Sequence, residues 1–112
     1  MSNYDFDQYS KQAAETIDYP DAGNNLYYPA LGLCGEAGEV AEKIKKIIRD
    51  KNGEVSARDR IELTKELGDV QWYINALCFE LRIELEHVAV GNICKLKSRV
   101  KRGVIGGSGD NR

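Results

Sequence analysis

Histidine is nearly absent from this sequence, which holds a single one, His87, among 112 residues. The three cysteines, Cys34, Cys78 and Cys94, form no CxxC pair, and the two prolines both lie in the first third of the chain. A zinc site, a Glu-x-x-His di-metal oxidase site and a nucleophilic triad therefore lack the ligands or partners that they need. The cysteines stand among apolar neighbours, so we predict buried free thiols in a reducing compartment.

Long apolar runs and blocks of like charge are also missing. No stretch approaches the roughly 20 apolar residues of a membrane-spanning helix, and the polar first residues do not resemble a signal peptide. The formal net charge is only −2, and no Lys/Arg block marks a nucleic-acid-binding arm. We therefore expect a cytoplasmic protein without membrane or nucleic-acid partners, folded as one domain over residues 1–112.

Apolar residues recur at intervals of three and four along most of the chain, which predicts helices rather than strands. The predicted helices span residues 5–17, 26–51, 57–81 and 85–101. Asn52-Gly53 is expected to end the second, and Ser56 with Asp59 forms a capping box that begins the third. The glycine-rich residues 103–112 are predicted to be flexible. The fold class is therefore all-α, with four helices arranged as in a bundle.

The third predicted helix carries more apolar bulk than one buried stripe requires. Trp72, Tyr73 and Phe79 lie outside the stripe, and a helix that is apolar on several sides needs more than one partner surface. A chain this short gains by burying such surface between subunits, so we predict a homo-oligomer.

Two pairs of carboxylates stand at i, i+3 on the two longest predicted helices: Glu36 with Glu39, and Glu66 with Asp69. Each pair shares one helix face, and packed helices can bring the two faces together. Four clustered carboxylates repel unless cations are present, and an oxygen-only ligand set suits Mg²⁺, with Mn²⁺ as the alternative. Glycines that are costly inside helices flank these acids and predict a close approach by backbone or ligand: Gly32, Gly35, Gly38 and Gly68.

Basic residues extend the acidic pattern. Lys43 and Lys46 follow Glu36 and Glu39 on the same side of the second helix, and the fourth helix carries a polar stripe of Asn92, Lys95, Arg99 and Arg102. Any one of these features is common on a solvated helix, and other acids such as Glu80 are interpreted as ordinary surface residues. Together, acids for a metal and bases for phosphate oxygens outline a site for a nucleotide polyphosphate.

The same residues resemble the signature of MazG-like all-α nucleoside triphosphate pyrophosphatases. The matching segments are LCGEAGEV at residues 33–40, KELGDVQWY at residues 65–73 and NICKLKSR at residues 92–99. The resemblance implies a MazG-type fold, dimers or tetramers, and hydrolysis of an NTP or dNTP to the monophosphate and pyrophosphate. It implies Mg²⁺ ligands at Glu36, Glu39, Glu66 and Asp69, with Glu39 and Glu36 as the catalytic pair and Glu39 acting on the attacking water. It further implies phosphate or sugar contacts from Lys43, Lys46, Asn92, Lys95 and Arg99, and base contacts from Tyr9, Trp72 and Tyr73.

Several alternatives stay open at this point. The helices could form an oligomeric module that binds a nucleotide or a metal without turnover, with the acids in a structural role. Within the same superfamily, the substrate could be dUTP or phosphoribosyl-ATP. The glycines and Arg112 of residues 103–112 could close over a bound nucleotide.

Overall fold

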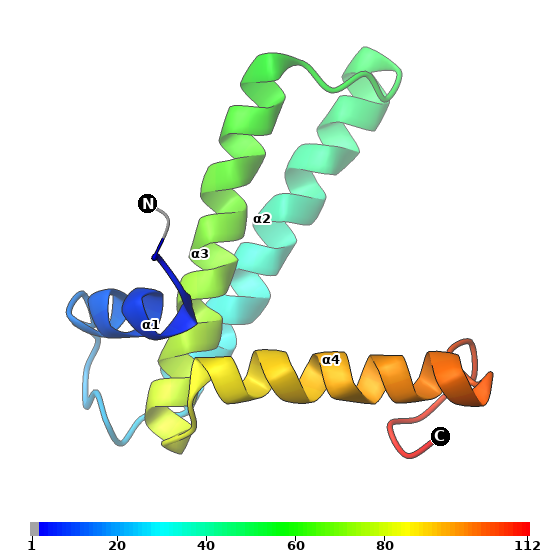
Figure 1. Ribbon diagram of the computed structural model, residues 1–112. Helices are drawn as coiled ribbons and strands as arrows, with labels where there is room; N and C mark the ends of the chain where they lie inside the picture. Colours follow the sequence, from blue (N-terminus) through cyan, green and yellow to red (C-terminus); the bar gives the residue numbers. More distant parts are fainter. Residues whose placement is uncertain (1–2) are drawn as a thin grey trace.

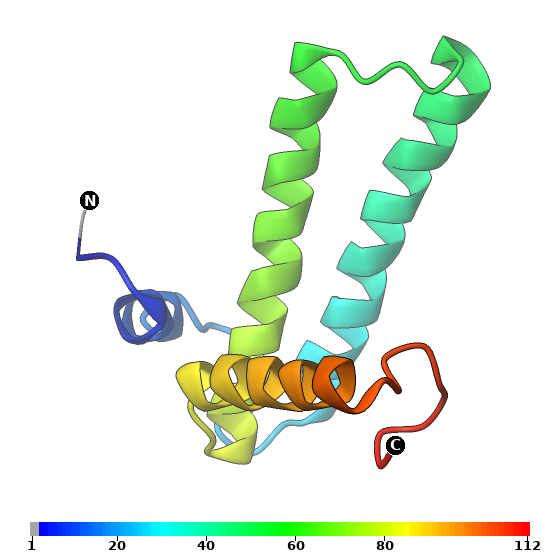
Figure 2. The ribbon, with the colours of Figure 1, turned by 45° about the vertical axis from the view of Figure 1, so that its right-hand side comes forward.

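The computed structural model describes residues 3–112 and contains four helices with no strand in that range. They are α1 (Phe6–Ala14), α2 (Tyr27–Lys51), α3 (Ala57–Leu81) and α4 (Leu85–Arg102). Helices α2 and α3 form a long antiparallel hairpin, and α1 and α4 lie across its open end (Figures 1 and 2). The all-α prediction is confirmed. None of the described helices has the length and hydropathy needed to cross a membrane.

The ends of the long helices are set by local sequence. The Ser56 hydroxyl accepts from the Asp59 backbone N–H, and the Asp59 carboxylate accepts from the Ser56 N–H, so the predicted capping box begins α3. At the other side of the turn, Asn52 (φ 54°) and Gly53 (φ 80°) end α2 in the left-handed region. Helix α1 ends earlier than predicted because Thr16 and Ile17 turn back to the carbonyls three residues before them.

The loop between α1 and α2 is tied to the far end of α3 by Glu80. Its carboxylate accepts hydrogen bonds from the Tyr19 hydroxyl and from the backbone N–H groups of Gly23 and Asn25, the last two at 2.8 and 2.7 Å. The interpretation of Glu80 as an ordinary surface residue is therefore wrong. Glu80 holds the residues just before α2 against the last turn of α3.

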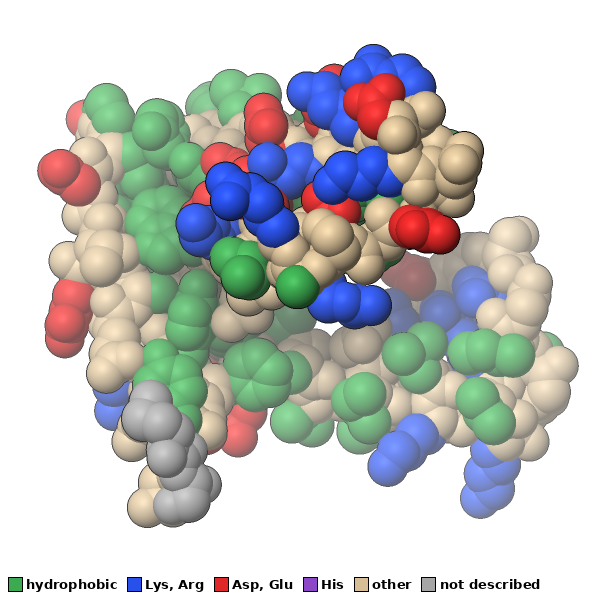
Figure 3. Space-filling view, turned by 90° about the horizontal axis from the view of Figure 1, so that it is seen from above, with side chains coloured by type: hydrophobic (Ala, Val, Ile, Leu, Met, Phe, Trp, Pro, Cys, Tyr) green, Lys and Arg blue, Asp and Glu red, His purple; other side chains and the backbone are tan. Residues whose placement is uncertain are grey.

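The buried core is small, and much of it lies where α1, α3 and α4 meet. Ala13, Ala76, Cys78 and Leu85 are almost fully buried there. Pro29 and Ile47 of α2 and Tyr19 of the preceding loop are also buried. The prediction of buried thiols holds for Cys78 but is wrong for Cys34 and Cys94, which are exposed because no other described element covers their faces of α2 and α4. Figure 3 looks down on the tip of the hairpin, where Lys and Arg side chains gather, with hydrophobic side chains exposed around it.

Candidate functional site

Three of the four predicted acids meet in the groove between α2 and α3. One carboxylate oxygen each from Glu36, Glu66 and Asp69 lies within 4.8 Å of the other two. Glu66 and Asp69 share a face of α3 because they stand at i, i+3, and the packing of the hairpin sets Glu36 of α2 opposite them. Glu36 and Glu66 are half-buried, while Asp69 is open to solvent. The group is thus a cluster of negative charge with one accessible side.

The electrostatics of this cluster favour a cation. Burial, the charge of Asp69, and the hydrogen bond and charge of Glu66 raise the pKa of the Glu36 carboxyl, and Glu39 adds to the effect. Carboxylates this close must either share protons or bind a positive charge. Oxygen donors at this spacing fit a hard divalent cation such as Mg²⁺, so the residues present suit the metal that the sequence predicts.

Glu39 does not belong to the same group of oxygens. It lies one turn beyond Glu36 on α2 and is exposed, although its charge reaches Glu36. The structure thus brings together Glu36, Glu66 and Asp69, and leaves Glu39 at the margin. Its assignment as a metal ligand and as the residue that acts on water stays a prediction.

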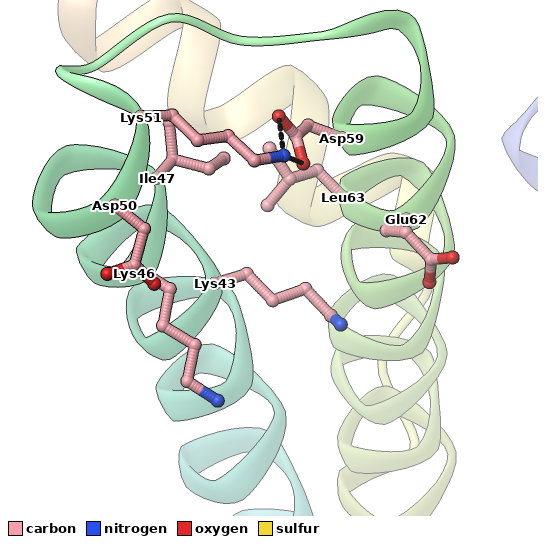
Figure 4. A pocket seen from close by; sticks show the side chains of 8 residues that line it. All are labelled: Lys43, Lys46, Ile47, Asp50, Lys51, Asp59, Glu62 and Leu63. Atoms are coloured by element: carbon pink, nitrogen blue, oxygen red, sulfur yellow. Dashed lines mark hydrogen bonds and ion pairs between the residues drawn. The ribbon is translucent and has the colours of Figure 1, made fainter.

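The two lysines predicted to contact phosphate line a pocket of about 180 Å³ nearer the hairpin tip, together with Lys51 and Asp59. Figure 4 shows Lys43 reaching across from α2 toward α3. Its Nζ is 3.9 Å from the Glu66 Oε1, so Lys43 adjoins the acidic cluster directly. Lys46 instead pairs with Glu42 at 3.7 Å, and Lys51 pairs with Asp59 at 2.8 Å.

On the other side of the acids lies a cluster of aromatic rings. Tyr73 stands one turn after Asp69, and its ring contacts Trp72 edge-on at a centroid distance of 5.0 Å. Burial and the charges of Tyr28, Glu36 and Asp69 raise the pKa of the Tyr73 hydroxyl. A Cβ on Gly32 would lie 2.2 Å from the Tyr73 Cε1, so the ring packs directly on the α2 backbone. Tyr73 therefore borders the acids, and its assignment as a base contact stays a prediction.

The two remaining aromatic candidates lie on the α1 side of α3. Burial, followed by the charges of Tyr4 and Asp69, raises the pKa of the Tyr9 hydroxyl. The indole N–H of Trp72 donates to the Thr16 Oγ1 at 2.7 Å, so Trp72 helps to fasten α1 to α3. Trp72 thus contributes to packing between α1 and α3, and the assignment of Tyr9 and Trp72 as base contacts stays a prediction.

The predicted phosphate contacts on α4 are not joined to the acids. Helix α4 packs on α1, and no hydrogen bond or ion pair links Asn92, Lys95 or Arg99 to the acidic cluster among the residues described. Lys95 and Arg99 instead bind Asp110 of the same chain. The assignment of these three residues to phosphate or sugar stays a prediction.

Comparison with known proteins identifies the family of this chain. The model of the MazG nucleotide pyrophosphohydrolase domain matches residues 29–104, which include the acids, the lysines and the stripe of α4. The chain therefore belongs to the MazG nucleotide pyrophosphohydrolase family. It is also similar to the Gene 37 protein of Mycobacterium phage L5, at 49% identity over 111 residues that cover 95% of this chain and 97% of the phage protein. No solved structure matches the chain.

Proposed function

We propose that this protein hydrolyses nucleoside triphosphates, ribo or deoxy, to the monophosphate and pyrophosphate in a Mg²⁺-dependent reaction. The observation that carries the proposal is the convergence of Glu36, Glu66 and Asp69, with Lys43 3.9 Å from Glu66. Acids alone would repel a triphosphate, and bases alone would bind it without activating it. The groove holds both, side by side.

The order of groups along the groove matches the order of groups in a nucleotide. Lys43 lies on the hairpin-tip side of the acids, and Tyr73 on the opposite side. A triphosphate could therefore extend toward Lys43, with its base toward Tyr73 and Tyr9. Aromatic rings stack on any base, so this wall supports binding without fixing which base is preferred.

The chemistry divides between the acids and the bases. Mg²⁺, when bound, supplies charge that neutralises phosphate oxygens and activates water at neutral pH. Glu36, Glu66 and Asp69 would hold the cation, and Glu39, at the exposed edge of the cluster, would orient or deprotonate the attacking water. Lys43 and Lys46 would stabilise the charge that develops on the pyrophosphate. We further propose that this activity removes unwanted nucleotides from the cellular pool, a role that only the resemblance to the family implies.

Pyrophosphate release from a panel of NTPs and dNTPs tests the proposal. We expect release with Mg²⁺, none with a chelator, and a loss of about 100-fold or more in Glu39→Gln if Glu39 acts on the water. Glu54→Gln is the matched control, because Glu54 is an exposed carboxylate in the turn between α2 and α3. A folded protein that turns over no nucleotide would favour the module that binds without catalysis. Turnover restricted to dUTP or phosphoribosyl-ATP would identify a specialised relative.

We also propose that the protein works as a homodimer or homotetramer. Apolar side chains lie open on all three long helices, among them Leu31 (72% exposed), Ile48 (63%) and Val100 (65%). Ile44 and Ile48 flank a shallow apolar hollow on α2. We expect light scattering to give a mass of two or four times 12.5 kDa, and Ile48→Glu to lower it. A monomer that stays folded at micromolar concentration would contradict this expectation.

A further inference from the structure

Residues 103–112, the C-terminal segment, fold back onto α4 instead of leading away from it (Figure 1). Gly103 (φ 74°) ends the helix and Gly109 (φ 82°) turns the chain, both in a region that favours glycine. Asp110 then lies on the polar stripe of α4. Its Oδ1 is 3.3 Å from the Lys95 Nζ and 3.2 Å from the Arg99 Nη2. The Asp110 carboxylate thus pairs with Lys95 and Arg99, two of the cations that the sequence predicts to bind phosphate.

Asp110 accepts only some of the hydrogen bonds that the Arg99 guanidinium can donate. Arg99 is 4% exposed, and its Nη2 donates to the main-chain oxygen of Asp110 at 2.8 Å as well as to the carboxylate. Its Nε has no partner among the residues that the structure describes. A guanidinium group commonly holds an oxyanion through two adjacent N–H groups, and phosphate offers more acceptor oxygens than one shared carboxylate oxygen. The cationic pair therefore suits phosphate better than it suits Asp110.

The contacts that hold the segment are of a kind that a ligand can displace. The Asp110 side chain is 82% exposed, and exposed ion pairs contribute little to stability. The segment keeps its shape mainly through Arg112, whose guanidinium donates to the carbonyls of Val104, Ile105 and Gly109. All three of these bonds lie within the segment, whereas its main-chain oxygens accept from α4 only through Arg99 and Arg102 among the residues described. The segment can therefore leave α4 as a unit once those few bonds break.

We propose that the C-terminal segment is an intramolecular competitor for the phosphate-binding cations Lys95 and Arg99, and that it leaves α4 when a phosphate-bearing ligand binds. The identity of that ligand as a nucleotide or pyrophosphate rests on the proposed function. The competition itself needs only an anion and these two side chains.

Calorimetric binding of inorganic pyrophosphate, without divalent ions, measures the competition. We expect Asp110→Asn to bind pyrophosphate about threefold more tightly than the wild type, the range that an exposed ion pair allows. Asp18→Asn removes the same charge from the exposed loop before α2 and should bind as the wild type does. Gly107→Ala keeps the charge but would place a Cβ 2.7 Å from the Arg112 Cδ, which loosens the segment. It should also tighten binding.

Departure of the segment can be followed by NMR through the amide signals of Gly106, Gly107 and Gly109. We expect pyrophosphate to shift them toward the positions and relaxation of flexible chain in the wild-type protein. Equal affinity in all four proteins, no binding in any of them, or unchanged glycine signals at saturation would each overturn the proposal. If pyrophosphate displaces the segment but no nucleotide is hydrolysed, the proposed function fails and the competition stands. If nucleotides are hydrolysed with an unchanged KM in Asp110→Asn and pyrophosphate affinity is unaffected, the competition fails alone.

Discussion

Asp69→Asn is expected to lower the rate of pyrophosphate release by roughly 100-fold or more, because it replaces one of the three converging carboxylates with a neutral amide, a much weaker ligand for a divalent cation. The same change is expected to raise the melting temperature of the metal-free protein. The charge of Asp69 contributes to the raised pKa of Glu36, so its removal relieves repulsion between neighbouring carboxylates. Activity and metal-free stability should therefore move in opposite directions.

Thermal unfolding with and without Mg²⁺ separates this explanation from general damage to the fold. A cation that binds only the folded state raises the melting temperature, so Mg²⁺ should stabilise the wild type and have little effect on Asp69→Asn. Glu54→Gln should keep both the activity and the response to Mg²⁺. If Asp69→Asn lost stability without metal, or kept its response to Mg²⁺, the acidic cluster would not be the metal site.

Features that depend on neighbours in sequence could be predicted from the sequence. The Ser56–Asp59 capping box and the end of α2 at Asn52-Gly53 are contained within a few residues, and both are found in the structure. The pair Glu66 and Asp69 shares a face because of helix geometry alone. That Glu36 would oppose them followed from two amphipathic helices joined by a short turn.

Features that depend on distant contacts could not be predicted. Glu80 accepts from residues 55 to 61 positions earlier, and nothing near it in sequence distinguishes it from a solvated acid. The position of Asp110 on Lys95 and Arg99 depends on how the chain turns after α4, which composition alone suggested to be flexible. Spacing alone groups Glu39 with Glu36, whereas the structure brings together oxygens of Glu36, Glu66 and Asp69, and the role of Glu39 stays a prediction.

The glycines beside the acids also differ in whether a distant part of the chain contacts them. The sequence predicts that four of them permit close approach by backbone or ligand. Three have open space around them within the described chain, so a ligand contact there stays a prediction: Gly35, Gly38 and Gly68. Only Gly32 has a neighbour, the ring of Tyr73. Its role is therefore specific and can be tested separately from that of the others.

Gly32→Ala is expected to lower the free energy of unfolding by about 2 kcal/mol, the usual cost of forcing extra volume into a packed contact. The added Cβ would lie 2.2 Å from the Tyr73 Cε1, and Tyr73 is confined by Trp72 and Tyr28. Relief requires either the ring or the α2 backbone to move. Either movement disturbs the spacing between Glu36 on α2 and Asp69 on α3, so pyrophosphate release should fall as well.

Gly35→Ala is the matched control, since nothing lies within 4 Å of the added Cβ. Alanine is the better helix former, so this variant should gain about 0.5–1 kcal/mol in unfolding free energy. Combining Gly32→Ala with Tyr73→Leu removes the clashing ring atom, and a double-mutant cycle should show that the two changes together cost less than their sum. The double variant should recover stability but not full nucleotide affinity, because the proposed wall of the base pocket is gone. Additive losses in stability would show instead that Gly32 serves something other than the approach of Tyr73.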